Sequence, residues 1–150
     1  MKRPREVAVP PALSAALEQL LGESVAGVRV IERSWFVRLH GPAIATTRRE
    51  RIYLRGTAAN FFASPWLVLH EYWHVVGQWR RGRLTVPRYL LECARRGYWN
   101  NRFEVEARAC ADRHAASLAR LLALPPGADL QYAPRSRGLR AMGKRPSQTP

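Results

Sequence analysis

The chain has 150 residues, of which 47% are hydrophobic, and it carries a formal net charge of +14. This hydrophobic content excludes a wholly disordered chain, and the length fits one domain with one core. Its two cysteines do not make a disulfide framework, so the sequence neither requires nor excludes an oxidising compartment.

The two ends are predicted to lie outside a globular domain of residues 10–126. Residues 1–9 are expected to be a flexible basic arm. No continuous apolar run follows the basic start, so we expect no cleaved signal peptide and a cytoplasmic protein, with non-classical export left open. The most apolar window, 61–76, is too short and too polar to span a membrane. Residues 127–150 are expected to be a basic, disordered tail.

The first half of the domain is predicted to form one helix followed by a small sheet. Pro10-Pro11 begins a helix that ends near Leu21, with Gly22 as its stop. Strands are expected at 28–31, 35–39, 44–46 and 51–55. The last two of these are expected to pair as a hairpin across Arg48-Arg49-Glu50.

The second half is predicted to be helical, over 65–80, 87–96 and 101–122. Ser64 can cap the first of these helices, whose first position is Pro65. Gly97 stops the second helix, and Pro125-Pro126 prevents continuation of the third. Because the strands are grouped before these helices, we expect an α+β fold.

The first of these helices carries an HExxH pentad, which begins at His70 and ends at His74. Residues four apart lie on one face of a helix, so the two imidazoles can hold one Zn²⁺. Glu71, between them, can act as a general base on a metal-bound water. The alternative interpretation is two histidines that pack on a buried helix.

A catalytic zinc site needs a third protein ligand. The HExxHxxGxxH pattern would place it at Arg80, although Gly77 fits the glycine of that pattern. Arginine stays protonated and cannot ligate. The metzincin completion of the site is therefore excluded.

The other completion is a glutamate on a downstream helix. Glu104 shares its helix face with small and apolar residues, namely Ala107, Ala111, Ala115, Leu118 and Leu122. Glu106 points to a solvated face. A carboxylate aimed into a core needs a partner, so Glu104 is the favoured ligand. Two alternatives stay open: a capping box of Asn101 with Glu104, and Glu92 as the ligand.

The segments HEYWHVVGQW and GYWNNRFEVEARACA resemble the gluzincin arrangement of zincin metallopeptidases, in which a glutamate on a second helix completes HExxH. Residues 20–78 also resemble the metallopeptidase-like core domain associated with extracellular contractile injection systems. The resemblance covers about residues 10–122. It implies a zincin-like fold, with a small sheet packed on the active-site helix. It also implies that His70, His74 and Glu104 bind Zn²⁺, with Glu71 as general base.

Two positions depart from these families. Related gluzincins often have an acidic residue four positions after the ligand glutamate, where it orients a histidine. Arg108 occupies that position here, and Asp112 or a backbone carbonyl is the candidate substitute. Gly77 stands where the injection-system family usually has glutamine. Either departure is compatible with a metal site of weak or no peptidase activity.

The leading hypothesis is a zinc metallopeptidase that hydrolyses peptide bonds in a peptide or protein substrate. Tyr98 and His114 are candidate groups for stabilising the oxyanion, each with the alternative of a packing or helix-edge residue. The second hypothesis is a catalytically inactive zincin-fold interaction or cargo module. The third is a basic protein that binds nucleic acid through its Arg-rich tail.

Overall fold

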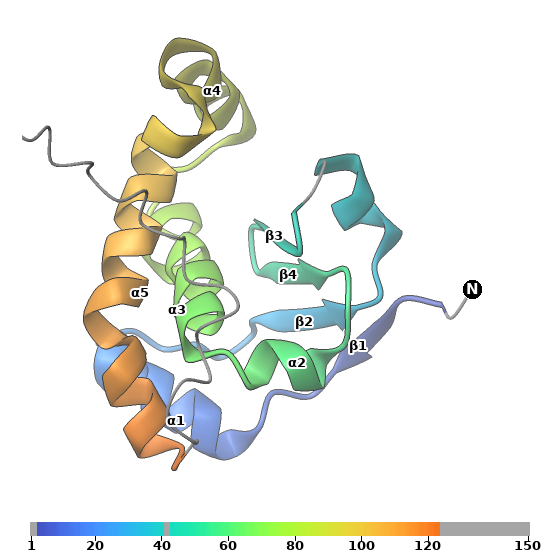
Figure 1. Cartoon of the computed structure of the whole chain (residues 1–150), viewed down its shortest axis with the longest axis vertical. Coiled ribbons are helices and arrows are strands. Elements are labelled where there is room, and N and C mark those ends of the chain that lie inside the picture. The colour runs from blue at the N-terminus through green and yellow to red at the C-terminus, as the bar shows by residue number, and fades with distance from the viewer. Residues whose placement is uncertain (1–2, 41–42, 124–150) are drawn as a thin grey trace, which may run out of the picture.

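The computed structural model describes residues 3–40 and 43–123, which form a small sheet beside a group of helices (Figure 1). Its elements in chain order are β1 (Arg5–Val7), α1 (Pro11–Leu21), β2 (Arg29–Glu32), the 3₁₀ helix η1 (Trp35–His40), β3 (Ala45–Arg48), β4 (Arg51–Leu54), α2 (Ala58–Phe62), α3 (Pro65–Trp73), the π-helix η2 (His74–Trp79), α4 (Val86–Asn100) and α5 (Arg102–Leu121). The predicted α+β class is confirmed. The predicted tail at 127–150 lies outside the described residues.

The sheet is mixed and has the strand order β1-β2-β4-β3. β1 runs antiparallel to β2, β2 runs parallel to β4, and β3 and β4 form an antiparallel hairpin. This hairpin was predicted, and its turn lies at Arg49-Glu50. β3 is an edge strand of the described sheet. It lies beside α3, because the Thr47 hydroxyl of β3 donates a hydrogen bond to Glu71 of α3.

The predicted strand at 35–39 is wrong, because these residues form the 3₁₀ helix η1. The strand β2 ends before Arg33, which has a left-handed φ of 55°. Ser34 then turns the chain, since its Oγ accepts a hydrogen bond of 3.2 Å from the backbone N–H of Phe36. A side chain that binds the backbone locally competes with strand pairing, and here it prevails.

Arg5–Val7, expected in a flexible arm, instead form the strand β1. This strand pairs antiparallel with β2, and the buried side chain of Glu32 at the end of β2 adds a side-chain contact. One of its oxygens pairs with Arg5 Nη2 at 3.0 Å, and the other accepts a hydrogen bond of 3.0 Å from the backbone N–H of Ala58. One carboxylate thus fixes the first strand and the start of α2, a short helix that sequence patterns did not indicate.

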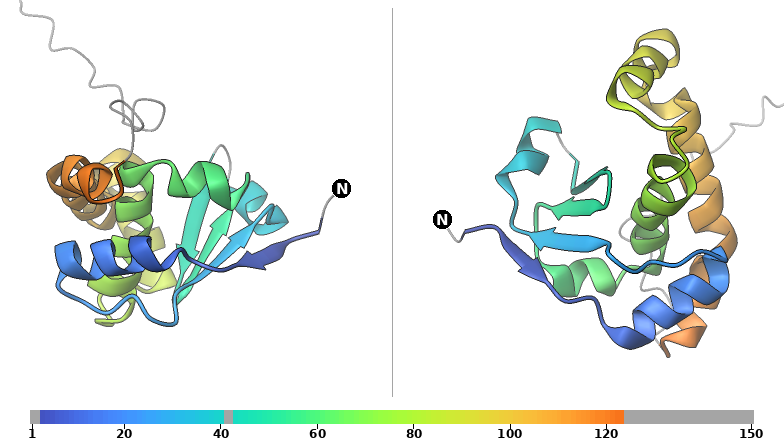
Figure 2. Two further views of the ribbon diagram at one scale, coloured as in Figure 1. Left: turned by 90° about the horizontal axis from the view of Figure 1, so that it is seen from below. Right: turned by 180° about the vertical axis from the view of Figure 1, so that it is seen from behind.

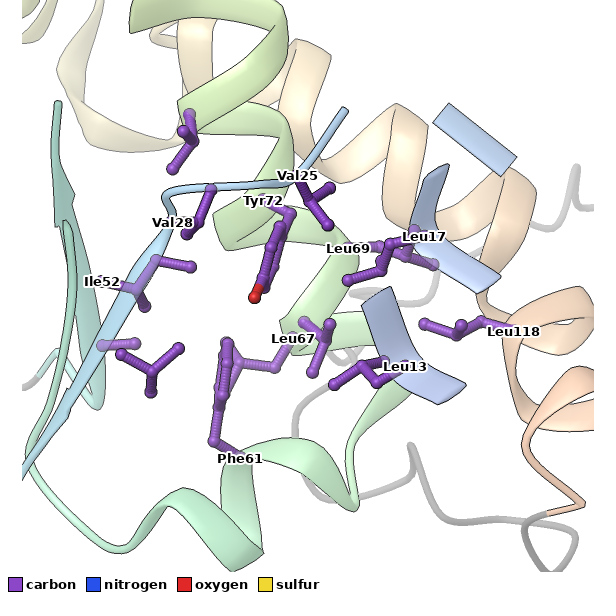
Figure 3. Close-up of a cluster of buried hydrophobic side chains, with 14 of the residues drawn as sticks. Leu13, Leu17, Val25, Val28, Ile52, Phe61, Leu67, Leu69, Tyr72 and Leu118 are labelled. Carbon is purple, nitrogen blue, oxygen red and sulfur yellow. The ribbon is translucent and has the colours of Figure 1, made fainter. Parts of the chain in front are cut away.

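The core lies on both sides of α3, which is placed between the sheet and α5 (Figure 2). Side chains from α1, β2, β4, α2 and α5 converge on it (Figure 3). Eight of the nine residues of α3 are buried, so this helix has no solvent-exposed face. Its histidines and glutamate are therefore held in a rigid, closely packed setting.

Tyr72, inside the pentad, is fully buried in this core at 0% exposure (Figure 3). Its hydroxyl has no hydrogen-bond partner among the described residues, and burial raises its pKa. We expect Tyr72→Phe to increase the free energy of unfolding by about 1 kcal/mol, because a buried hydroxyl without a partner is removed. Urea unfolding of metal-free protein measures this, with the half-buried Tyr53→Phe as control. A loss of stability in Tyr72→Phe would contradict the prediction.

Candidate metal centre

The helix that carries the pentad begins as predicted. Ser64 Oγ accepts a hydrogen bond from the backbone N–H of Leu67, and Pro65 occupies the first helical turn. The helix changes type at His74, where α3 continues as the π-helix η2. There the backbone N–H of Arg80 donates to Val75 O, five residues earlier, at 3.0 Å. π-Helical turns within α-helices are frequent at functional sites.

Gly77 is required by packing within this π-helix. A Cβ at this position would lie 2.6 Å from Cε2 of Trp73, whose indole covers the glycine. Any side chain here would displace Trp73. Gly77 thus has a packing role against its own helix.

The structure brings His70, His74 and Glu104 together as a buried group that could hold a metal ion. The two Nε2 atoms are 3.2 Å apart, and they lie 3.3 and 3.6 Å from the two oxygens of Glu104. Ligand atoms bound tetrahedrally at about 2.0–2.1 Å from Zn²⁺ are themselves about 3.3 Å apart. The three side chains therefore lie close enough to share one metal ion, with each imidazole nearest to a different oxygen of Glu104.

The carboxylate of Glu104 has the chemistry of a metal ligand. Its Oε1 accepts a hydrogen bond of 2.7 Å from the Tyr89 hydroxyl, while its buried Oε2 has no hydrogen-bond partner among the described residues. Burial raises the pKa of Glu104, but the imidazoles of His70 and His74 and the Tyr89 hydroxyl outweigh it and lower the pKa to about 2. An ionised, buried carboxylate that faces two imidazoles is suited to bind a cation between them.

The alternatives for Glu104 do not hold in the structure. Asn101 caps α5 by accepting a hydrogen bond of 3.0 Å from Phe103 N, and its own N–H donates to Tyr98 O. The capping box with Glu104 is therefore not formed. Glu92 is not in the group of three, and instead lies near two arginines, Arg96 at 3.5 Å and Arg102 at 3.8 Å.

Arg80, which excluded the metzincin pattern, has a structural role. Its guanidinium binds Glu50 of the hairpin turn, with Nη2 at 2.7 Å from Oε2. It also donates to the backbone carbonyls of Ser24 and Ala26. Arg80 thus joins the end of η2 to the hairpin and to the loop after α1.

Gln78 fixes the tautomer of His74. Its Nε2 donates a hydrogen bond of 2.9 Å to the backbone carbonyl of Phe103, which can only accept. Its Oε1 therefore faces His74 Nδ1, at 2.8 Å, and that nitrogen must carry the proton. The lone pair of His74 is left on Nε2, the atom that faces Glu104 and His70.

We expect Gln78→Leu to lower the zinc affinity of the folded chain by about 10–100-fold. This is the usual effect of losing a residue that hydrogen-bonds to a metal-binding histidine. Gln78→Glu keeps an acceptor for His74 Nδ1 and should lose less. Competition with a chromophoric chelator measures both variants, with the exposed Gln19→Leu as control. Equal affinity in folded Gln78→Leu and wild type would mean that the amide does not orient His74.

His70 is oriented by stacking. Its Nδ1 has no hydrogen-bond partner in the described part of the chain, but its ring stacks on Trp66 with centroids 5.2 Å apart and planes at 18°. Trp66 Nε1 in turn donates a hydrogen bond of 2.7 Å to Asp112. Asp112, the candidate partner of a metal histidine, therefore binds the tryptophan behind His70. Arg108 turns away, to the ring and carbonyl of Trp99.

Glu71 lies beside the group of three and is also buried. Its Oε2 accepts a hydrogen bond of 2.7 Å from Thr47 Oγ1, on the edge strand β3. Burial raises the pKa of Glu71, and the His74 imidazole and the Thr47 hydroxyl only partly oppose this. The carboxylate is thus held in position, with a proton affinity above that of an exposed glutamate.

The four residues lie in a cleft of about 590 Å³. Its lining comes from η1, β3, the pentad helix with its π-helical continuation, α4 and α5. The lining residues include Phe36, Leu39, Ala45, Thr47, Arg48, Trp79, Leu84, Val86, Tyr89, Leu90 and Tyr98. Tyr98, a predicted candidate, is therefore in the cleft. His114 is half-buried on α5 and does not line it. The cleft gives an extended molecule access to Glu71 and to the ligand atoms.

Three residues of the site were not anticipated: Thr47, Gln78 and Tyr89. A sequence signal existed only for Gln78, which is four residues after His74 on the same helical segment. Thr47 and Tyr89 reach the site through the tertiary fold from β3 and α4.

Comparisons with protein-family models, with curated proteins and with solved structures find no significant match to this chain. None of the helices within 3–40 and 43–123 has the length and apolar character that crossing a membrane requires. The function must therefore be inferred from the geometry of the site.

Proposed function

We propose that this chain is a zinc-dependent metallopeptidase with a zincin-like fold. His70, His74 and Glu104 would hold Zn²⁺, and Glu71 would be the general base. The observation that carries the proposal is the convergence of two imidazoles and a carboxylate in an open cleft, with a further carboxylate beside them. Two imidazoles and one carboxylate are a donor set typical of catalytic zinc.

The position of the sheet supports the zincin-like part of the proposal. The edge strand β3 lies beside the pentad helix, and α5, which carries Glu104, lies on the opposite side of that helix (Figure 1). This is the arrangement expected from the gluzincin resemblance. The departure at Arg108 is compensated in part by Gln78, which orients His74 from within its own helix.

When bound, Zn²⁺ would lower the pKa of a coordinated water to about 7 and polarise a substrate carbonyl. Glu71 would accept a proton from that water and later donate it to the leaving amine. Burial raises the pKa of Glu71 above that of an exposed glutamate, and this direction favours a group that must both accept and donate a proton. Thr47 binds one oxygen of Glu71, which leaves Oε1 for the proton transfer.

Tyr98 is the candidate donor to the oxyanion. It lines the cleft, and its pKa is raised by burial and by the nearby charges of Glu104 and Glu71. Its hydroxyl therefore stays protonated at neutral pH and can donate a hydrogen bond to developing negative charge.

The test is metal analysis of the purified full chain together with cleavage of an unfolded protein substrate. We expect about one zinc per chain, with cleavage that is lost on chelation and restored by Zn²⁺. A chain that takes up no zinc on reconstitution would overturn the site. Full zinc occupancy without cleavage of any unfolded substrate would favour a catalytically inactive interaction or cargo module.

A further inference from the structure

Three arginines form a row across the sheet, one from each of three neighbouring strands. Arg29 of β2 pairs in register with Arg51 of β4, and Arg51 pairs with Arg48 of β3. Directly paired residues project from the same face of a sheet, with Cβ atoms about 4.5–5.5 Å apart. All three side chains are exposed. Like charges in direct register are unfavourable, so this row is not explained by the stability of the sheet.

The row has little compensating charge. Arg29 approaches Glu6 of β1 at 3.8 Å, where both side chains are more than half exposed. Arg48 and Arg51 have no ion-pair partner among the described residues. The acid in the hairpin turn, Glu50, is bound by Arg80. The row therefore presents net positive charge that an anionic ligand could neutralise.

One end of the row is in the cleft. Arg48 lines the cleft. Its side chain projects from the face of β3 opposite to that of its neighbour Thr47, which binds Glu71, so the row lies on the far face of the sheet and meets the cleft at the edge strand. From there the row crosses β4 to β2, because β3 is the edge strand on the cleft side. Adjacent strands lie about 4.8 Å apart, so the row is about 10 Å long, the length of about three residues of extended peptide. A chain that leaves the cleft over β3 would pass along it.

We propose that the Arg48–Arg51–Arg29 row is a substrate subsite that selects a peptide or protein with acidic residues on one side of the cleaved bond. This inference rests on the proposed peptidase function. The row meets the cleft at Arg48, and this favours an acidic polypeptide over a nucleic acid, because carboxylates on a peptide that leaves the cleft around the edge strand β3 would reach the row. Exposed ion pairs contribute modestly, about threefold in affinity for each pair.

The experiment uses two peptides that share one apolar core and differ in a tail of four Glu or four Gln. Binding is measured by fluorescence anisotropy on the full-chain Glu71→Gln variant, and cleavage on the full chain with Glu71 intact. We expect the Glu-tailed peptide to bind about tenfold more tightly at low salt, with the difference shrinking as salt rises. The double variant Arg29→Gln/Arg51→Gln should lose most of this preference. The exposed Arg113→Gln on α5 is the matched control.

Equal binding and equal cleavage of the two peptides would overturn the subsite and leave the peptidase proposal intact. If neither peptide is cleaved, the peptidase proposal fails. If the preference for the Glu tail persists in that case and requires Arg29 and Arg51, the row is a docking surface for acidic polypeptides. Tighter binding of a single-stranded oligothymidylate, with loss of that binding in the double variant, would overturn the acidic-polypeptide assignment. The melting temperature of the double variant should not fall, since like-charge repulsion is removed.

Discussion

Glu104→Gln is expected to lower the zinc affinity of the chain by more than about 100-fold. Loss of a group that orients a ligand lowers metal affinity by about 10–100-fold, and Glu104 is proposed to supply a ligand atom itself. It also supplies the only carboxylate in the group of three. An amide of the same shape removes the negative charge that balances the metal. Chelator competition and metal analysis after dialysis measure the loss.

The matched control is Glu92→Gln, on the neighbouring helix α4, because Glu92 is the other glutamate that sequence reasoning left open. Its carboxylate lies near Arg96 and Arg102, and the variant should keep full zinc affinity. Retention of zinc in Glu104→Gln would remove Glu104 from the site, and a loss in Glu92→Gln would reassign the ligand.

Glu71→Gln is expected to keep zinc and lose catalysis. A positioned general base contributes about 10²–10⁴-fold to a rate, so kcat should fall by that factor. The glutamine can still accept the hydrogen bond from Thr47, which keeps the side chain in place. Zinc content and steady-state cleavage of one peptide are measured on the same preparation.

The control for loss of one acid is Glu23→Gln, at a partly exposed residue whose carboxylate pairs with Arg81. If Glu71→Gln also loses zinc, Glu71 belongs to the metal site and is not the base. If cleavage survives the substitution, another group takes the proton. The two substitutions therefore have different expected results, since Glu104→Gln should lose both zinc and cleavage, whereas Glu71→Gln should lose only cleavage.

The sequence was most informative where the chemistry depends on helix geometry. His70 and His74 are one turn apart, and the inward face of α5 identified Glu104, because both relations are local to one helix. Thr47 and Tyr89 could not be predicted, since each contacts the site only after β3 or α4 has packed. The strand expected at 35–39 failed because one hydroxyl, that of Ser34, diverts the chain.

The π-helix from His74 to Trp79 affects how this chain should be compared with other HExxH sequences. Its hydrogen bonds span five residues where an α-helix spans four, so the segment contains one residue more than a regular turn needs. Deleting one residue between His74 and Gln78 would favour the α-helical pattern and shorten their separation from four residues to three, which changes how the amide approaches His74 Nδ1. An alignment with a one-position gap after the second histidine would still match every residue of the pentad. The gap would nevertheless mark a change in the group that orients the imidazole of His74.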